Sequence, residues 1–160
     1  MASSDQHLID DFDLKILQMV QENNQIPQRE ISDRVGLSAP AVARRLQRLR
    51  ANGVIRKDMA IVDEYALGRP LTIIVEVTSE SERLDLLDDM KRRFALCPQV
   101  LHCYYVTGEA DFILIMNVKD MDEYTALTRL LFFDGGNVKS FRTSVTMEKV
   151  KSHGPVPLQF

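Results

Sequence analysis

The 160-residue sequence lacks the marks of a membrane protein and of a secreted one. No apolar run approaches the ~20 residues that span a bilayer. The N-terminal stretch MASSDQHLIDDFD has neither the basic nor the apolar region of a secretory signal. Two cysteines, Cys97 and Cys103, are too few for a disulfide framework and are expected to be reduced. We therefore expect a cytoplasmic globular protein without a membrane partner, built of one domain or two small ones.

Motifs of catalysis and metal binding are also missing. His7, His102 and His153 have no ligand spacing to one another or to the cysteines, so no metal site is expected. The sequence has no phosphate loop, nucleophile elbow or G-x-G-x-x-G motif, and no evident set of acid, base and nucleophile. We expect neither a cofactor nor an enzyme.

Positive charge is concentrated in one part of the chain. The net charge is −3, but residues 28–57 carry eight basic residues against Glu30 and Asp33, which is +6 for the window and leaves −9 elsewhere. Such an asymmetry indicates a nucleic-acid partner even in an acidic chain. The eight basic residues are Arg29, Arg34, Arg44, Arg45, Arg48, Arg50, Arg56 and Lys57.

The first 60 residues show the periodicity of three short helices, over residues 10–23, 28–36 and 38–52. Phe12 and Ile16 lie on the apolar face expected for the first helix. Pro27 separates the first two helices, and Gly36 suits the C-terminal cap of the second. Ser38 is expected to cap the third helix. The spacing of the second and third helices is typical of a helix-turn-helix.

The third expected helix has two distinct faces. Val42, Leu46 and Leu49 form a core stripe, and Ala41, Arg44, Arg45 and Arg48 form a separate face beside it. A solvated surface helix would normally mix charge signs, but no acidic residue occurs from Ser38 to Lys57. This pattern predicts a helix that faces DNA, because arginine pairs with guanine or holds phosphate.

The stretch VIRKDMAIVD follows, with strand-like residues around a charged turn, and predicts the wing of a winged helix-turn-helix. Arg56 and Lys57 would meet neighbouring phosphates there. The small residues at the start of the third helix would let its backbone approach the groove. The complete predicted DNA-binding set is Ser38, Ala39, Pro40, Ala41, Arg44, Arg45, Arg48, Arg56 and Lys57.

From Leu71 the periodicity changes to βαββαβ. Strands are expected in LTIIVEVT, QVLHCYYVTG, DFILIMNV and NVKSFRTSVTMEKV, with helices over residues 79–98 and 119–133. The order is that of a ferredoxin-like split βαβ fold. The chain is therefore α+β, with a winged helix-turn-helix domain at 8–62, a hinge at 63–70, a ferredoxin-like domain at 71–151 and a tail at 152–160.

The third strand of this domain, FILIMNV, is apolar on both faces. Two helices can cover only one side of a four-stranded sheet. The uncovered apolar side predicts that a second copy of the chain packs on it, giving at least a dimer.

Five segments in order resemble the Lrp/AsnC (leucine-responsive, feast/famine) family of transcription regulators. They are DDFDLKIL, EISDRVGLSAPAVARRLQRLRANGVI, AIVDEYALG, VTGEADFIL and VKSFRTSVTMEKVK. The resemblance implies a regulator that binds double-stranded DNA through a winged helix-turn-helix. It also implies an Lrp-type βαββαβ domain that binds a small molecule, usually an amino acid, and dimers that associate further, often into octamers.

The resemblance places the effector near the turn VTGEAD between the second and third strands of the C-terminal domain. Gly108 allows a tight turn whose N–H groups could accept a carboxylate, and Glu109 or Asp111 could meet an ammonium group. The simpler alternative is a plain hairpin with solvated acids. The predicted effector-binding residues are Val106, Thr107, Gly108, Glu109, Ala110 and Asp111.

Two positions depart from the family pattern. FFDGGN stands where relatives often have Leu-Pro-Gly, and Ala110 stands where they often have an aromatic residue. The first departure leaves the identity of the effector open, and the second is expected to enlarge or weaken the pocket. The main alternative function is a nucleoid-type architectural protein that binds DNA without an effector; an enzyme of ferredoxin-like fold is the alternative from another class.

Overall fold

A computed structural model describes residues 9–159 of the chain. Leu8, the expected start of the first domain, lies outside these residues, as do His7 and Phe160. The chain forms two compact units. One contains the residues up to Ile61 together with the segment from Lys151 onward, and the other runs from Val62 to Val150.

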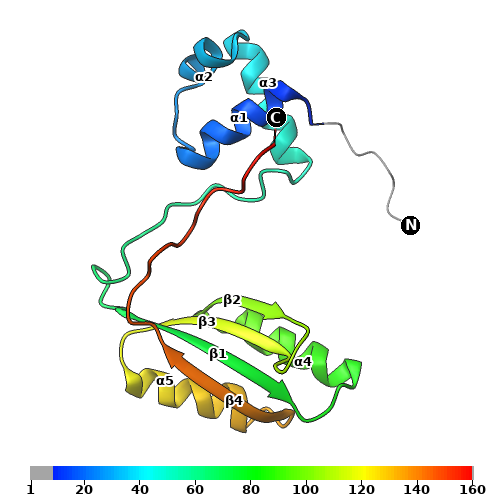
Figure 1. The fold of residues 1–160 in the computed structure, drawn as a ribbon, viewed down its shortest axis with the longest axis vertical. Coiled ribbons are helices and arrows are strands. Elements are labelled where there is room, and N and C mark those ends of the chain that lie inside the picture. Colours follow the sequence, from blue (N-terminus) through cyan, green and yellow to red (C-terminus); the bar gives the residue numbers. More distant parts are fainter. Residues whose placement is uncertain (1–8, 160) are drawn as a thin grey trace. The chain divides into compact units, whose positions relative to one another are not determined.

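Three helices build the first unit: α1 (Asp11–Glu22), α2 (Gln28–Val35) and α3 (Ala39–Ala51) (Figure 1). Their boundaries follow the expected signals. Gly36 ends α2 in the left-handed conformation, with a φ of 73°, and the Ala41 N–H donates to the Ser38 hydroxyl at the start of α3. The apolar stripes meet in one small core, formed by Ile16, Ile31, Val35, Val42 and Leu46.

The predicted wing is not a β-hairpin in this structure: within residues 9–159, no strand begins before Leu71. Residues 54–62 form an irregular segment in which only Ile55 packs against the core. Asp58 accepts hydrogen bonds from Arg50 at the end of α3, with 2.9 Å between Asp58 Oδ2 and Arg50 Nε. This ion pair holds the segment beside α3, and the exposed Val54 and Met59 have no strand partner in the described part of the chain.

The second unit is a four-stranded antiparallel sheet with helices on one face (Figure 1). Its strands are β1 (Leu71–Ser79), β2 (Val100–Tyr105), β3 (Phe112–Val118) and β4 (Val138–Val145), in the order β2-β3-β1-β4. Its helices are α4 (Leu84–Leu96) and α5 (Met121–Thr128), and α5 continues as a π-helical turn over Arg129–Phe133. This order confirms the ferredoxin-like prediction.

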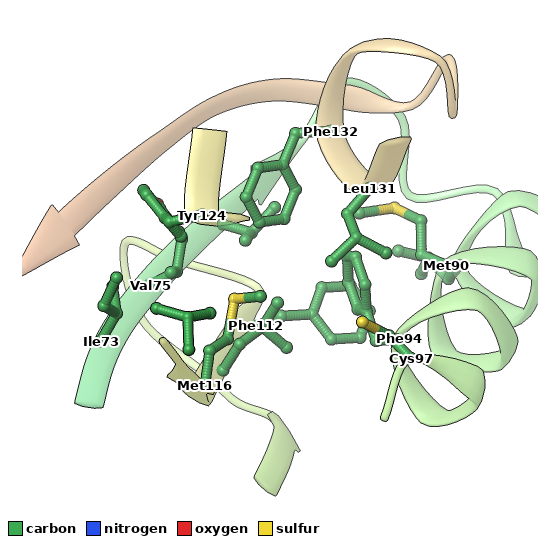
Figure 2. Close-up of a cluster of buried hydrophobic side chains, with 14 residues drawn as sticks. Ile73, Val75, Met90, Phe94, Cys97, Phe112, Met116, Tyr124, Leu131 and Phe132 are labelled. Carbon is green, nitrogen blue, oxygen red and sulfur yellow. The ribbon is translucent and has the colours of Figure 1, made fainter. Parts of the chain in front are cut away.

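The core of this unit lies between the sheet and the two helices. Alternate residues of β1, Ile73, Val75 and Val77, are fully buried, as the period-two pattern predicts. Figure 2 shows Phe94 of α4 beside Phe112 of β3, with ring centroids 5.4 Å apart in an edge-to-face arrangement. The remaining members pack around these rings and include Leu87, Met90, Cys97, Leu114, Met116, Val118, Tyr124, Leu131 and Phe132.

The hinge is anchored to the second unit by Arg69. Its guanidinium Nη2 donates to the Glu123 carboxylate at 2.9 Å and to the Asn117 carbonyl at 3.1 Å. Burial alone would raise the pKa of the Glu123 carboxyl, but the Lys119 N–H, Arg69 and Gln99 donate to it and together lower its pKa to about 2. Glu123 therefore binds the hinge as a carboxylate.

The other face of the sheet carries an apolar centre. Ile74 pairs with Ile115, and Ile113 pairs with Tyr104, so all four side chains share the face that no helix of the second unit covers. Ile74 and Tyr104 are exposed, and Ile113 and Ile115 are half-buried. The predicted uncovered surface is present.

Among residues 9–159, no helix is long and apolar enough to cross a membrane.

Candidate functional site

The first turn of α3 is an open backbone surface. Ser38 and Pro40 are exposed, and Ala39 and Ala41 are half-buried with no side chain beyond Cβ. The N–H groups of this turn carry the partial positive charge of a helix N-terminus. A phosphate can therefore approach the backbone here without displacing a large side chain.

Arg44 continues this surface one turn further along α3. Its side chain is exposed, and within residues 9–159 no carboxylate lies within ion-pair distance of its guanidinium. Arg56 and Lys57, in the irregular segment after the helix, are likewise exposed and unpaired with any described acid. These three cations are the part of the predicted DNA-binding set that carries uncompensated charge.

Arg45 and Arg48 are held by the first helix instead. Nη1 of Arg45 lies 2.7 Å from Asp10 Oδ2 and 2.8 Å from Asp13 Oδ1, and Arg48 Nη2 donates to the other oxygen of Asp13. The Asp13 side chain is completely buried. A carboxylate removed from water needs compensating cations, so Arg45 and Arg48 join α3 to α1.

Asp10 completes this cluster as the N-cap of α1. Its carboxylate accepts the Asp13 N–H at 2.8 Å, and the Asp13 carboxylate accepts the Asp10 N–H in return, which forms a capping box. The Asp13 N–H and then the Arg45 guanidinium lower the pKa of the Asp10 carboxyl. The hydrogen bonds from Arg45 to Asp10 and Asp13 raise the pKa of the guanidinium in turn.

The predicted effector turn is a tight connection between β2 and β3. The Val106 N–H donates to the Asp111 carbonyl at 2.8 Å, and Gly108 has a φ of 129°, which a residue with a side chain rarely adopts. Thr107, Gly108 and Glu109 are exposed, while Val106, Ala110 and Asp111 are half-buried. The structure thus presents the Thr107 hydroxyl and the Glu109 carboxylate at the surface of the turn.

Asp111 joins the turn to the end of β1. Its Oδ2 accepts from the Ser79 N–H at 2.6 Å and from the Ser79 hydroxyl at 2.7 Å, and its own N–H donates to the Val77 carbonyl at 2.9 Å. One carboxylate oxygen is therefore committed to the fold. Of the two acids considered for an ammonium group, Glu109 is the exposed one.

The loop FFDGGN, which departs from the family pattern, is in close contact with Arg93. The guanidinium of Arg93 lies against Gly135, with Nη1 at 1.1 Å from the place where a Cβ of residue 135 would stand. Any side chain at this position would force Arg93 to move. Asn137, two positions further along the loop, exchanges two hydrogen bonds of 3.0 Å with the backbone of Ser81 and so joins the loop to the segment before α4.

The cysteines, histidines and tyrosines form no catalytic or metal cluster within the described chain. Cys97 is buried and Cys103 is exposed, both as free thiols. The ring of His102 stacks on that of Tyr104, with centroids 6.1 Å apart. No group of three potential metal ligands occurs among residues 9–159.

Comparison with known protein families divides the chain into the same two domains. Residues 9–56 match the family model of a winged helix-turn-helix DNA-binding domain, and residues 72–156 match that of the Lrp/AsnC ligand-binding domain. The second match alone covers more than half of the chain. The chain belongs to the Lrp/AsnC family.

Relatives of the Lrp/AsnC family match over nearly the whole length. An uncharacterised HTH-type transcriptional regulator of Sinorhizobium fredii is 46% identical over 94% of this chain and 89% of its own. The leucine-responsive regulatory protein of Haemophilus influenzae is 35% identical over 89% and 86%. A transcriptional regulator of Neisseria meningitidis, solved in complex with L-Met, is 28% identical, covers 94% and 97%, and has a TM-score of 0.84.

Family membership confirms that the chain is a transcription regulator with a DNA-binding and a ligand-binding domain, and not an enzyme.

The sequence did not indicate the ion-pair partners of two predicted DNA-binding residues, Arg45 and Arg48. Asp10 and Asp13 could be seen as a capping pair three residues apart, but their ion pairs with Arg45 and Arg48 join residues 32 to 35 positions away. Only the packing of α1 against α3 brings these groups together.

Proposed function

We propose that this Lrp/AsnC-family regulator reads specific sequences in double-stranded DNA with α3 and responds to an amino acid bound at the β2–β3 turn. The observation that carries the first part is the exposed, uncompensated Arg44 beside the open N-terminal turn of α3. An arginine in this place can reach a base edge while the helix terminus holds a phosphate.

The other predicted residues take supporting roles in this proposal. Arg56 and Lys57 contact flanking phosphates from the segment after α3. Arg45 and Arg48 hold α3 on α1 and keep part of their donors for phosphate, because a guanidinium has five N–H groups and each uses a single nitrogen for its ion pairs. Ser38, Ala39, Pro40 and Ala41 form the surface that meets the DNA backbone.

The DNA proposal is tested by Arg44→Ala, with Arg34→Ala as the matched control. Arg34 is exposed in the same unit but paired with Glu30. A base contact by Arg44 should cost about 1–3 kcal/mol on the specific site and relax specificity, whereas a phosphate contact weakens specific and random DNA alike. The melting temperature of Arg44→Ala should stay unchanged, because Arg44 has no described ion pair.

Two results would contradict this assignment. One is an Arg44→Ala protein that binds both DNA types as the unchanged protein does. The other is an affinity that does not fall with salt, because phosphate contacts release counterions. Binding sites are first obtained by enrichment of bound genomic DNA, and they should be roughly palindromic for a dimer.

The effector proposal rests on the exposed backbone of Thr107, Gly108 and Glu109. Backbone N–H groups of a turn suit a carboxylate, and the Glu109 carboxylate suits an ammonium group, which are the two charges of an amino acid. The names of similar proteins point the same way: one is leucine-responsive, and another was solved with L-Met. Val106, Ala110 and Asp111 shape the turn in this proposal.

A panel of amino acids at millimolar concentration tests the effector, with thermal melting and DNA footprints as the two measurements. At least one amino acid should shift both. Glu109→Gln should weaken that shift, while the control Glu82→Gln, an exposed acid outside the turn, should not. A footprint that is unresponsive and tolerant of sequence would instead identify an architectural DNA-binding protein.

A further inference from the structure

The C-terminal segment of the chain borders a groove of the DNA-binding unit. The groove has a volume of about 1180 Å³ and runs between α1 and residues 54–61. Leu14, Leu17 and Val20 line one side, and Ile55, Met59 and Ile61 line the other. Val156 and Leu158 of the tail line its edge: Val156 is 68% exposed, and Leu158 is the one half-buried residue of 151–159, the described part of the tail. The groove therefore has apolar side chains from α1, from residues 54–61 and from the tail, beside polar ones such as Gln21 and Asn24.

The side chain of Gln21 binds the backbone of this segment at two points. The Val156 N–H donates to Gln21 Oε1 at 2.7 Å, and Gln21 Nε2 donates to the Val156 carbonyl at 3.3 Å. A primary amide that accepts and donates on the same residue imitates the pairing between two strands. The pair of bonds fixes both the position and the direction of the segment on α1.

The sequence of the segment fits this arrangement. In Pro155-Val156-Pro157 only Val156 has an N–H, and this is the donor that Gln21 accepts. The two prolines restrict the chain before it docks, so less conformational entropy is lost when it is held along the groove. Their lack of N–H groups also leaves no unpaired backbone donor beside Val156.

We propose that residues 155–158 are a strap of the DNA-binding unit, held along the edge of the groove by Gln21 and by the half-buried Leu158. The chain leaves this unit after Ile61 and returns to it at Lys151. With the strap seated, the DNA-binding unit is joined to the ligand-binding unit by two segments of chain instead of one. A conformational change at the end of β4 is then transmitted to α1 through the C-terminal segment as well as through the hinge.

Hydrogen exchange of the Val156 amide in the full-length protein tests the strap. In the unchanged protein this amide should be protected. Gln21→Ala should make it exchange about tenfold faster, because the acceptor of its hydrogen bond is gone. Gln21→Glu should keep much of the protection, because a carboxylate still accepts from Val156 although it cannot donate to the carbonyl.

Gln28→Ala is the matched control, because Gln28 is an exposed glutamine of the same unit outside the groove. It should leave the Val156 amide protected. Leu158→Ser should accelerate exchange at Val156 while far-ultraviolet circular dichroism shows the helices intact. A Val156 amide that is unprotected in the unchanged protein, or equally protected in Gln21→Ala, would overturn the strap.

A mixing experiment decides which copy supplies the segment. One chain carries Gln21→Ala with an intact tail, and the other keeps Gln21 but ends at Gly154. If each strap binds within its own chain, Val156 stays unprotected in the mixture. Protection that reappears on mixing would show that the tail crosses to a second copy, and the proposal of an intrachain strap would be wrong.

Discussion

At the scale of single residues, two carboxylates organise the chain. Asp13 holds two arginines in the DNA-binding unit, and Glu123 holds Arg69 of the hinge in the other. Both sit in the first turn of a helix, where the helix dipole favours an anion. These ion pairs explain why Asp13 is fully buried and why Arg45, Arg69 and Glu123 are only partly exposed, although all four are charged residues.

Glu123 predicts a pH dependence of stability. Its pKa in the folded chain is about 2, below the ordinary value of 4.5. A lowered folded pKa stabilises the protein above the ordinary pKa, and the contribution is lost as the pH falls from about 4.5 towards 2. The free energy of unfolding in urea should therefore exceed that of Glu123→Gln at pH 7, and the gap should narrow below pH 4.5.

Asp122→Asn serves as the control, because Asp122 is an exposed acid in the same first turn of α5. Its difference from the unchanged protein should be small and nearly constant over that pH range. A gap for Glu123→Gln that stays constant down to pH 2 would contradict the lowered pKa.

At the scale of elements, periodicity and caps predicted every helix and all four strands of the sheet. The failures occur where no periodic pattern decides. The segment after α3 has strand-forming residues but no partner strand among residues 9–159, and its Asp58 is paired with Arg50 instead. Phe12 was expected on the apolar face of α1 but is 38% exposed, and Arg45 lies 5.5 Å from its ring centroid.

The contact between α1 and α3 gives a second prediction. Asp13→Asn should lower the free energy of unfolding of the DNA-binding unit by about 2–4 kcal/mol, because it weakens the pairing of a buried carboxylate with two arginines. Asp11→Asn, at an exposed acid two positions before Asp13 in the same turn, should cost much less. Differential scanning calorimetry measures both, and equal losses would remove the special role of Asp13.

Arg48→Ala separates this role from DNA binding. It should lower both the melting temperature and the DNA affinity, whereas Arg44→Ala should lower the affinity alone. An Arg48→Ala protein of unchanged melting temperature would show that its pair with Asp13 contributes little.

At the scale of the whole molecule, the uncovered face of the sheet predicts assembly. We expect a dimer at micromolar concentration, formed through the face that carries Ile74, Tyr104, Ile113 and Ile115. Further association of dimers, up to an octamer, is an expectation from the family resemblance alone. Ile115→Asp should shift the sedimentation mass towards that of a single 18.3 kDa chain. Leu84→Asp, which places the same charge at an exposed leucine of α4, should not. An unchanged protein that sediments as one chain would contradict the assembly.

The sequence by itself determined the two-part architecture, the βαββαβ succession of the second unit and the arginine-rich helix, although the helix expected to begin at residue 79 begins at Leu84. These features depend on residues two to four positions apart, which the chain displays directly. Tertiary structure alone decided which arginines are free and which are paired, that Asp111 is bound to Ser79, and that Gln21 holds Val156. Those contacts join residues far apart in the chain, and only the packing of the elements brings them within hydrogen-bond distance.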